Sequence, residues 1–193
     1  PWIEREFADF NNYFTRLGYM ISNGREQINV AMLHPIRSAY FEYKRYEEDF
    51  VRHIDDAFLN DCKLLSGAGV AYHLLDETLL AEHCFVKGCK IGCGKCSSDY
   101  LVLPHVLVTD ASTEKLLREY VDNGGKVLCL GDVPFYCEAE PFDYSYLASN
   151  CTFEDIVAAQ PFKVSERNIK VYNTYRELNG KMFLFVQNDD REN

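Results

Sequence analysis

Apolar residues recur along the chain in two patterns, one with helical spacing and one of short continuous runs. Near the N-terminus they return every three or four positions from Ile3 to Ile21, which predicts a long amphipathic helix that ends at Asn23-Gly24. Helical spacing returns over residues 38–66, where the part before Phe50 forms either a separate helix or an ordered loop. A further helix is predicted to open at Ser112 and to close at a pair of glycines.

The continuous apolar runs predict four buried strands, at residues 28–35, 70–75, 100–104 and 126–131. Strands that alternate with helices are typical of a parallel sheet with helices on both faces, so we expect an α/β fold with three α/β/α layers.

The segments between and after these runs are shorter or less regular. Asp76-Glu77-Thr78 is expected to cap a short helix that reaches Cys84, and residues 85–96 form a small hairpin or an irregular insert. Residues 152–159 are expected to form one or two helical turns. Asn179-Gly180 predicts a hairpin between residues 169–175 and 182–186.

Composition excludes several classes of protein. The 193 residues are 47% hydrophobic and 26% charged, which is typical of a globular chain. A net charge of −10 argues against a nucleic-acid partner, because such proteins present a basic face. The apolar runs are too short to cross a bilayer, and the first residues lack the features of a signal peptide. Since the chain also lacks an initiator Met, we expect it to be a piece of a longer protein.

The eight cysteines favour a reducing, cytoplasmic setting, since several lie inside apolar strand-like runs where a free thiol behaves as a small hydrophobe. One cluster could hold zinc, with His83 as an additional ligand; it consists of Cys84, Cys89, Cys93 and Cys96. A structural zinc site usually pairs two Cys-x2-Cys units, and this cluster has one. A hairpin with incidental small residues is therefore the favoured interpretation.

The order of the segments resembles part of a known family. Residues 10–24 (FNNYFTRLGYMISNG) are similar to the helix that leaves the catalytic barrel in large bacterial glycoside hydrolases of the α-L-rhamnosidase-like and β-galactosidase-like kinds. Residues 30–35 (VAMLHP) resemble the next strand of these enzymes, and residues 100–104 and 124–128 resemble later strands. Two departures are His34, where Tyr is common, and the Cys-rich insert at 84–96.

This resemblance implies a flavodoxin-like domain, related in fold to class I glutamine amidotransferases and to the β-galactosidase trimerisation domain. It implies a linking helix over residues 1–27, the α/β domain over 28–150, and a C-terminal extension over 151–193 that leads through a hairpin to a missing β-sandwich. In such enzymes catalysis belongs to the preceding barrel. The resemblance therefore implies that this chain supplies no catalytic residue, needs no cofactor, and has the barrel and the sandwich as partners.

Polar residues at the predicted carboxyl ends of strands are candidates for lining a cleft, because open α/β sheets bind ligands at this edge. They are His34, Asp76, Glu77, His105 and Asp132. Helix capping and solvated loop ends explain the same residues, and we favour that interpretation because fold position alone does not give function.

The expected function is that of a non-catalytic accessory domain, which braces the barrel and supports oligomerisation. Two alternatives remain. A cysteine-dependent hydrolase or amidotransferase would use Cys129, although Val127 stands where the nucleophile turn needs Gly and no His follows His105. A carbohydrate-binding module would use the many Tyr and Phe residues, for which we favour packing against a neighbouring domain.

Overall fold

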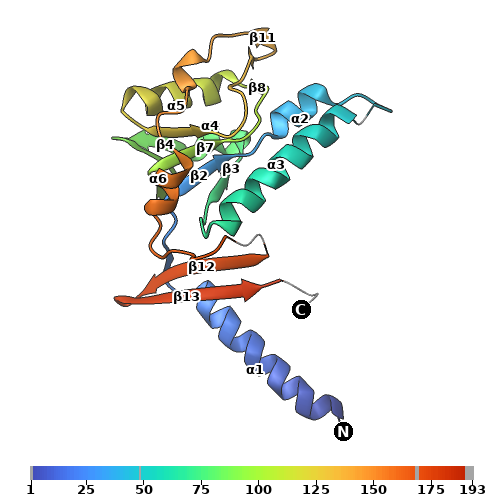
Figure 1. The fold of residues 1–193 in the computed structure, drawn as a ribbon, viewed down its shortest axis with the longest axis vertical. Helices are drawn as coiled ribbons and strands as arrows, with labels where there is room; N and C mark the ends of the chain where they lie inside the picture. Colours follow the sequence, from blue (N-terminus) through green and yellow to red (C-terminus); the bar gives the residue numbers. More distant parts are fainter. Residues whose placement is uncertain (1, 48, 168–169, 190–193) are drawn as a thin grey trace.

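The computed structural model describes residues 2–47, 49–167 and 170–189. At its centre is a sheet of four parallel strands, which confirms the predicted mixed α/β class and the parallel sheet (Figure 1). Each strand lies within one of the four predicted apolar runs. In spatial order they are β3 (His73–Leu75), β2 (Val30–Leu33), β7 (Tyr100–Leu103) and β9 (Lys126–Cys129).

Side chains of the sheet are buried on both faces. In β2, Ala31 and Leu33 belong to one hydrophobic cluster, whereas Val30 and Met32 belong to another, as expected for alternate residues of a strand. The first cluster also contains residues of α4 (Glu77–His83) and α5 (Ala111–Asp122), and the second contains residues of α3 (Asp49–Gly67) and α6 (Phe153–Ala158). This two-sided burial explains why the strands read as continuous apolar runs.

The helices begin at polar residues that cap them. Asp76 Oδ1 accepts a hydrogen bond from Thr78 N at 2.9 Å at the start of α4, as predicted. Asp110 Oδ1 accepts from Thr113 N at 2.6 Å, so α5 begins before the predicted Ser112. Two separate helices, α2 (Ile36–Glu42) and α3, cover most of residues 38–66, and residues 152–159 contain the short α6.

The Cys-rich segment after α4 is a regular antiparallel sheet of three strands joined by two tight turns. It consists of β4 (Cys84–Lys87), β5 (Lys90–Cys93) and β6 (Cys96–Ser98). Gly88 and Gly94 adopt positive φ values of 57° and 58° in the turns, a conformation that glycine adopts without steric cost. Of the two expectations for this segment, the hairpin is therefore confirmed.

The segment between β7 and α5 and the segment after β9 are mostly irregular. A second small sheet joins β8 (Val108–Thr109), β10 (Tyr136–Cys137) and β11 (Glu140–Pro141), and a single 3-10 turn, η1 (Ser145–Leu147), follows. The hydroxyl groups of Thr109 and Tyr144 lie 2.6 Å apart in the interior. This bond holds the irregular segment against the α/β body.

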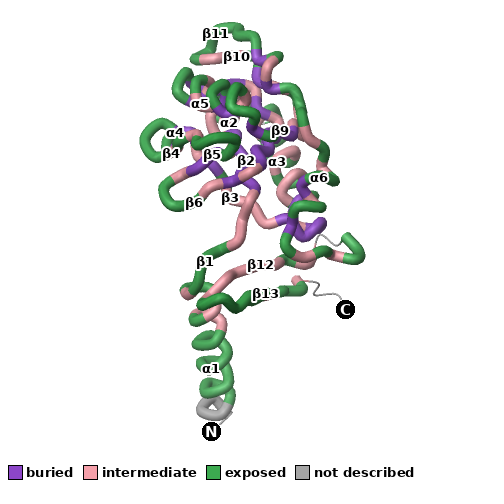
Figure 2. The backbone as a smooth tube through the Cα atoms, turned by 90° about the vertical axis from the view of Figure 1, so that its left-hand side faces the viewer, coloured by how far each residue is buried: buried purple, intermediate pink, exposed green. Residues whose placement is uncertain are grey.

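Two extensions lie at one end of the molecule. The predicted N-terminal helix is α1 (Trp2–Ser22), and the predicted hairpin is β12 (Val171–Leu178) with β13 (Lys181–Asn188), to which β1 (Arg25–Glu26) adds a third strand. Ile169, where the predicted hairpin begins, lies outside the described residues. Figure 2 shows α1 extending away from the α/β body with an exposed surface. None of the helices among the described residues is long and apolar enough to cross a membrane.

Candidate functional site

The carboxyl ends of β2 and β7 form the edge at which a ligand site is expected. β2 and β7 are neighbours in the sheet. The chain leaves β2 toward β3 on one side and leaves β7 toward β9 on the other side. Connections that leave two neighbouring strands in opposite directions create a crevice outside the carboxyl ends of these strands. His34 follows β2, and His105 lies just beyond β7. The structure therefore brings two of the predicted residues to this edge.

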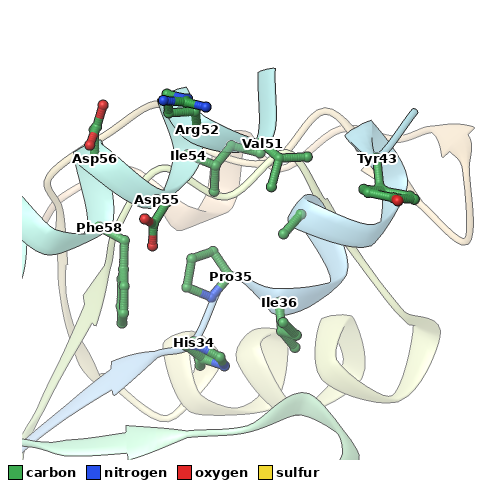
Figure 3. A pocket seen from close by; sticks show the side chains of 11 residues that line it. His34, Pro35, Ile36, Tyr43, Val51, Arg52, Ile54, Asp55, Asp56 and Phe58 are labelled. Atoms are coloured by element: carbon green, nitrogen blue, oxygen red, sulfur yellow. The ribbon is translucent and has the colours of Figure 1, made fainter. Parts of the chain in front are cut away.

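A cavity of about 720 Å³ opens between α2 and α3 at the end of β2. Pro35, Ile36 and Ile54 contribute apolar wall, and the ring of Phe58 lies 5.3 Å from the ring of His34. In Figure 3 the Asp55 carboxylate points from α3 toward Pro35. Arg52 and Asp56, which also line the cavity, point outward in the same view. The cavity thus offers an apolar wall with one carboxylate and one imidazole.

Another flank of α3 faces the end of β7. His53 lies on this flank, with its ring 6.0 Å from the ring of His105. Burial raises the pKa of Asp61 to about 6, and the nearby charge of His105 lowers it. A half-buried carboxyl group beside an imidazole can exchange a proton close to neutral pH. Neither His53 nor Asp61 stood out in the sequence, where both belong to the polar positions of a predicted helix.

A buried ionic group lies at the start of α4 and α5. Glu77 is 0% exposed, and its Oε2 accepts a hydrogen bond from Asp110 N at 3.3 Å. Arg37 approaches both carboxylates, with Nε 3.7 Å from Glu77 Oε2 and Nη2 2.7 Å from Asp110 Oδ2. Burial raises the pKa of Glu77 to about 7, against the effects of the Asp110 hydrogen bond and the Arg37 charge. Glu77 therefore lies in the protein interior and not on the wall of a cleft.

Asp76 and Asp132 occupy separate positions. Asp76 caps α4 and lines a cavity of about 200 Å³ beneath β4, β5 and β6. Asp132 is exposed in the loop after β9. The five predicted residues thus lie in five different places. His34 lines the α2–α3 cavity, His105 lies against His53, and Asp76 lines the smaller cavity. Glu77 is in the interior, and Asp132 is in an exposed loop. Arg37 and Asp110 were missed, although an Asp three residues before Thr113 is a recognisable capping signal.

The thiol of Cys129 lies in a packed environment. Its Sγ donates a hydrogen bond to the Leu147 carbonyl oxygen at 3.0 Å, and burial raises its pKa. A nucleophilic cysteine needs the opposite, a lowered pKa beside a base. This geometry suits a structural thiol.

The four cysteines of the predicted zinc cluster separate along the three-stranded sheet. Cys93 pairs with Cys84 on one side and with Cys96 on the other. Cys89 lies in the turn at the far end of β5, roughly 13 Å away at the usual rise along a strand. Across residues 2–47, 49–167 and 170–189, no group of three or more His, Cys, Asp or Glu side chains is placed to hold a metal ion.

Comparison with known proteins adds no functional assignment. No protein-family model matches the chain, and no curated protein matches it at a significant level.

Proposed function

We propose that this chain is a non-catalytic accessory domain of a bacterial glycoside hydrolase, with a flavodoxin-like three-layer α/β/α fold. Numbered in chain order, the four parallel strands of the sheet read 2-1-3-4, which agrees with the start of the flavodoxin-like order 2-1-3-4-5. Helices that pack on both faces of the sheet support the three layers. In this role the domain braces the catalytic barrel and precedes the β-sandwich.

The observation that carries the proposal is the apolar face of α1. Phe7, Phe10 and Phe14 are 59%, 56% and 50% exposed, and the rings of Phe10 and Phe14 lie 4.5 Å apart. They follow helical spacing and form one stripe on a helix that projects beyond the α/β body (Figure 1). Burying one such side chain stabilises an assembly by about 1.5–3 kcal/mol. A stripe of this kind is expected to pack against a neighbouring domain.

The hairpin beside α1 presents a second apolar surface. Met182, Leu184 and Val186 alternate along β13, so they share one face of the hairpin, and all three are exposed. Phe183 and Phe185 lie on the other face and line a cavity shared with α1. One face of the hairpin therefore packs toward α1, and the other is available to the β-sandwich of the proposed parent enzyme.

The thiols fit a cytoplasmic location for this parent. All eight cysteines are free, and thiols persist in reducing compartments. The proposal needs no cofactor in this chain.

The parent reading frame tests the proposal directly. We expect it to encode an upstream barrel with two carboxylates spaced for glycoside hydrolysis, and a downstream β-sandwich. In that enzyme, replacing Phe7, Phe10 and Phe14 together by Ser should lower the Tm of the barrel, whereas Asn11→Ser on the same helix should not. The isolated chain should hydrolyse aryl glycosides no faster than buffer. A reading frame without a barrel, or ordinary turnover by the isolated chain, would refute the proposal.

The α2–α3 cavity favours one second candidate, a carbohydrate-binding module. An apolar wall beside the Asp55 carboxylate and the His34 ring can receive the apolar face and the hydroxyl groups of a sugar. Calorimetric titration with monosaccharides distinguishes the two functions. Saturable binding that is lost in Asp55→Asn but kept in Asp56→Asn, whose side chain points outward, would favour the module.

A further inference from the structure

Three thiols form one row across the sheet of β4, β5 and β6. Cys84 of β4 is directly opposite Cys93 of β5, and Cys93 is directly opposite Cys96 of β6. Residues that pair across neighbouring strands point to the same face of a sheet. All three cysteines line the cavity of about 200 Å³ between this sheet and the core.

The two pairs of neighbouring thiols differ in their backbone geometry. Gly94 N donates a hydrogen bond to the His83 carbonyl oxygen at 3.1 Å, so the adjacent pair of Cys84 and Cys93 is a non-hydrogen-bonded pair. Such pairs have Cα atoms about 4.5 Å apart, within the range that a disulfide spans. Cys93 and Cys96 instead close a two-residue turn, which is a hydrogen-bonded pair with Cα atoms about 5.5 Å apart, and this separation also lies within the disulfide range.

Burial raises the pKa of Cys84, and the neighbouring Cys93 thiol raises it further, so the two side chains interact. Both are half-buried and pack against the hydrophobic cluster on this side of the central sheet. Other cysteines have different partners. Tyr72 lowers the pKa of Cys62 against the effect of burial, and Cys129 donates a hydrogen bond to a carbonyl oxygen. The pair of Cys84 and Cys93 therefore combines a Cα separation that a disulfide can span with a shared, half-buried position, whereas Cys96 is exposed.

We propose that Cys84 and Cys93 are a redox modification site, which forms a reversible disulfide by exchange with a low-molecular-weight disulfide such as oxidised glutathione. The Cys93 thiolate attacks one sulfur of the small disulfide, and one small thiolate leaves. Cys84 then loses its proton to solvent and attacks the Cys93 sulfur, which releases the second small thiol. Overall, two protein thiols are oxidised to one disulfide, and one small disulfide is reduced to two thiols.

Burial bears on the second step. It raises the pKa of Cys84, so the thiolate of this residue is scarce at neutral pH. We therefore expect closure to be faster at pH 9 than at pH 7, because more of Cys84 is then ionised. The product joins the C-terminal end of α4 to β5, since Cys84 is the residue that directly follows this helix.

The experiment treats the reduced 193-residue chain with oxidised glutathione and maps the cysteines by mass spectrometry without reduction. We expect a linked pair of peptides that contain Cys84 and Cys93, about 2 Da lighter than the sum of the two reduced peptides, and reversal by dithiothreitol. The same two residues should become protected from iodoacetamide together. A link between Cys93 and Cys96 would overturn the proposal, as would glutathione held stably on Cys93 without closure at pH 9.

Three variants make the test specific. Cys84→Ser should abolish closure and accumulate a mixed disulfide on Cys93, and Cys93→Ser should leave Cys84 reduced. Cys96→Ser is the matched control from the same row, and it should close within about twofold of the wild-type rate. Unchanged closure in folded Cys84→Ser would contradict the proposal. If this variant does not fold, the joint protection of Cys84 and Cys93 in the wild-type chain decides the question. Stoichiometric zinc bound through these thiols in the purified chain would also overturn it.

Discussion

The guanidinium group of Arg37 lies with Nη2 2.7 Å from Oδ2 of Asp110, so α2 is joined to the residue that caps α5. The same guanidinium lies 3.7 Å from the buried Glu77 at the start of α4. One cation thus serves two carboxylates that follow different strands of the molecule. This arrangement ties three helices together at the carboxyl edge of the central sheet.

Replacing Arg37 tests the strength of this tie. In Arg37→Met the aliphatic part of the side chain is kept, but Glu77 and Asp110 lose their cation. We expect the free energy of unfolding to fall by about 1–3 kcal/mol, less than for a fully buried pair because the Arg37 side chain is 40% exposed. Urea unfolding at pH 7 measures the change. Arg45→Met, a surface control, should stay within about 0.5 kcal/mol of wild type.

Glu77 predicts a specific pH dependence of stability. Its pKa of about 7 lies above the ordinary 4.5, so the folded state holds this proton more tightly than the unfolded state. The resulting stabilisation is present below pH 4.5 and is lost as the pH rises through 7. Glu77→Gln stays neutral, so its unfolding free energy relative to wild type should rise by about 3 kcal/mol between pH 4 and 8. Urea titrations at several pH values measure this difference.

The control for this titration is Glu119→Gln, which removes an exposed carboxylate of α5. Its difference from wild type should change little with pH. A constant difference between Glu77→Gln and wild type over the same range would contradict the buried, proton-binding state of Glu77.

His105 is expected to influence the titration of Asp61. Burial raises the pKa of Asp61 to about 6, and the charge of His105 holds it below the value that burial alone would produce. In His105→Gln the pKa of Asp61 should therefore rise. The side-chain carbon-13 shift of Asp61, followed by NMR from pH 4 to 8, reports this change. The exposed His83→Gln is the control, and an Asp61 pKa that falls in His105→Gln would contradict the electrostatic effect of His105.

Gly131 allows the chain after β9 to approach the chain after β7. A Cβ atom at this position would lie 2.7 Å from His105 Cα, a distance at which backbone must move. Gly131→Ala should therefore lower the free energy of unfolding by about 1–3 kcal/mol. Gly18→Ala on α1 is the matched control, because its Cβ would meet no atom within 4 Å. This second change should be neutral or stabilising by up to about 1 kcal/mol. Thermal or urea unfolding separates the two outcomes.

Features that depend on residues close together in the chain were predicted from the sequence, and features that depend on distant residues were not. The four strands and the helix α1 were predicted because apolar periodicity records which face of an element is buried. The cap at Asp76 was predicted because its partner, Thr78, lies two residues away. Glu77 was predicted to lie either on a cleft wall or at a helix cap or solvated loop end, with the second favoured, whereas the structure buries it. Its partners, Arg37 and Asp110, are distant in the chain, and no local pattern connects them.

By itself, the sequence determined the kind and order of the four central strands, the long helices and the C-terminal hairpin, but not the short strands β1, β8, β10 and β11, since spacing, capping residues and glycine turns act over a few positions. Tertiary structure alone decided the strand order around β2 and the burial of Glu77 beside Arg37. It also decided that Cys84 lies opposite Cys93, whereas Cys89 lies in the distant turn. Each of these depends on strand register and on helix packing, which bring together residues whose separation along the chain says nothing about their distance in space.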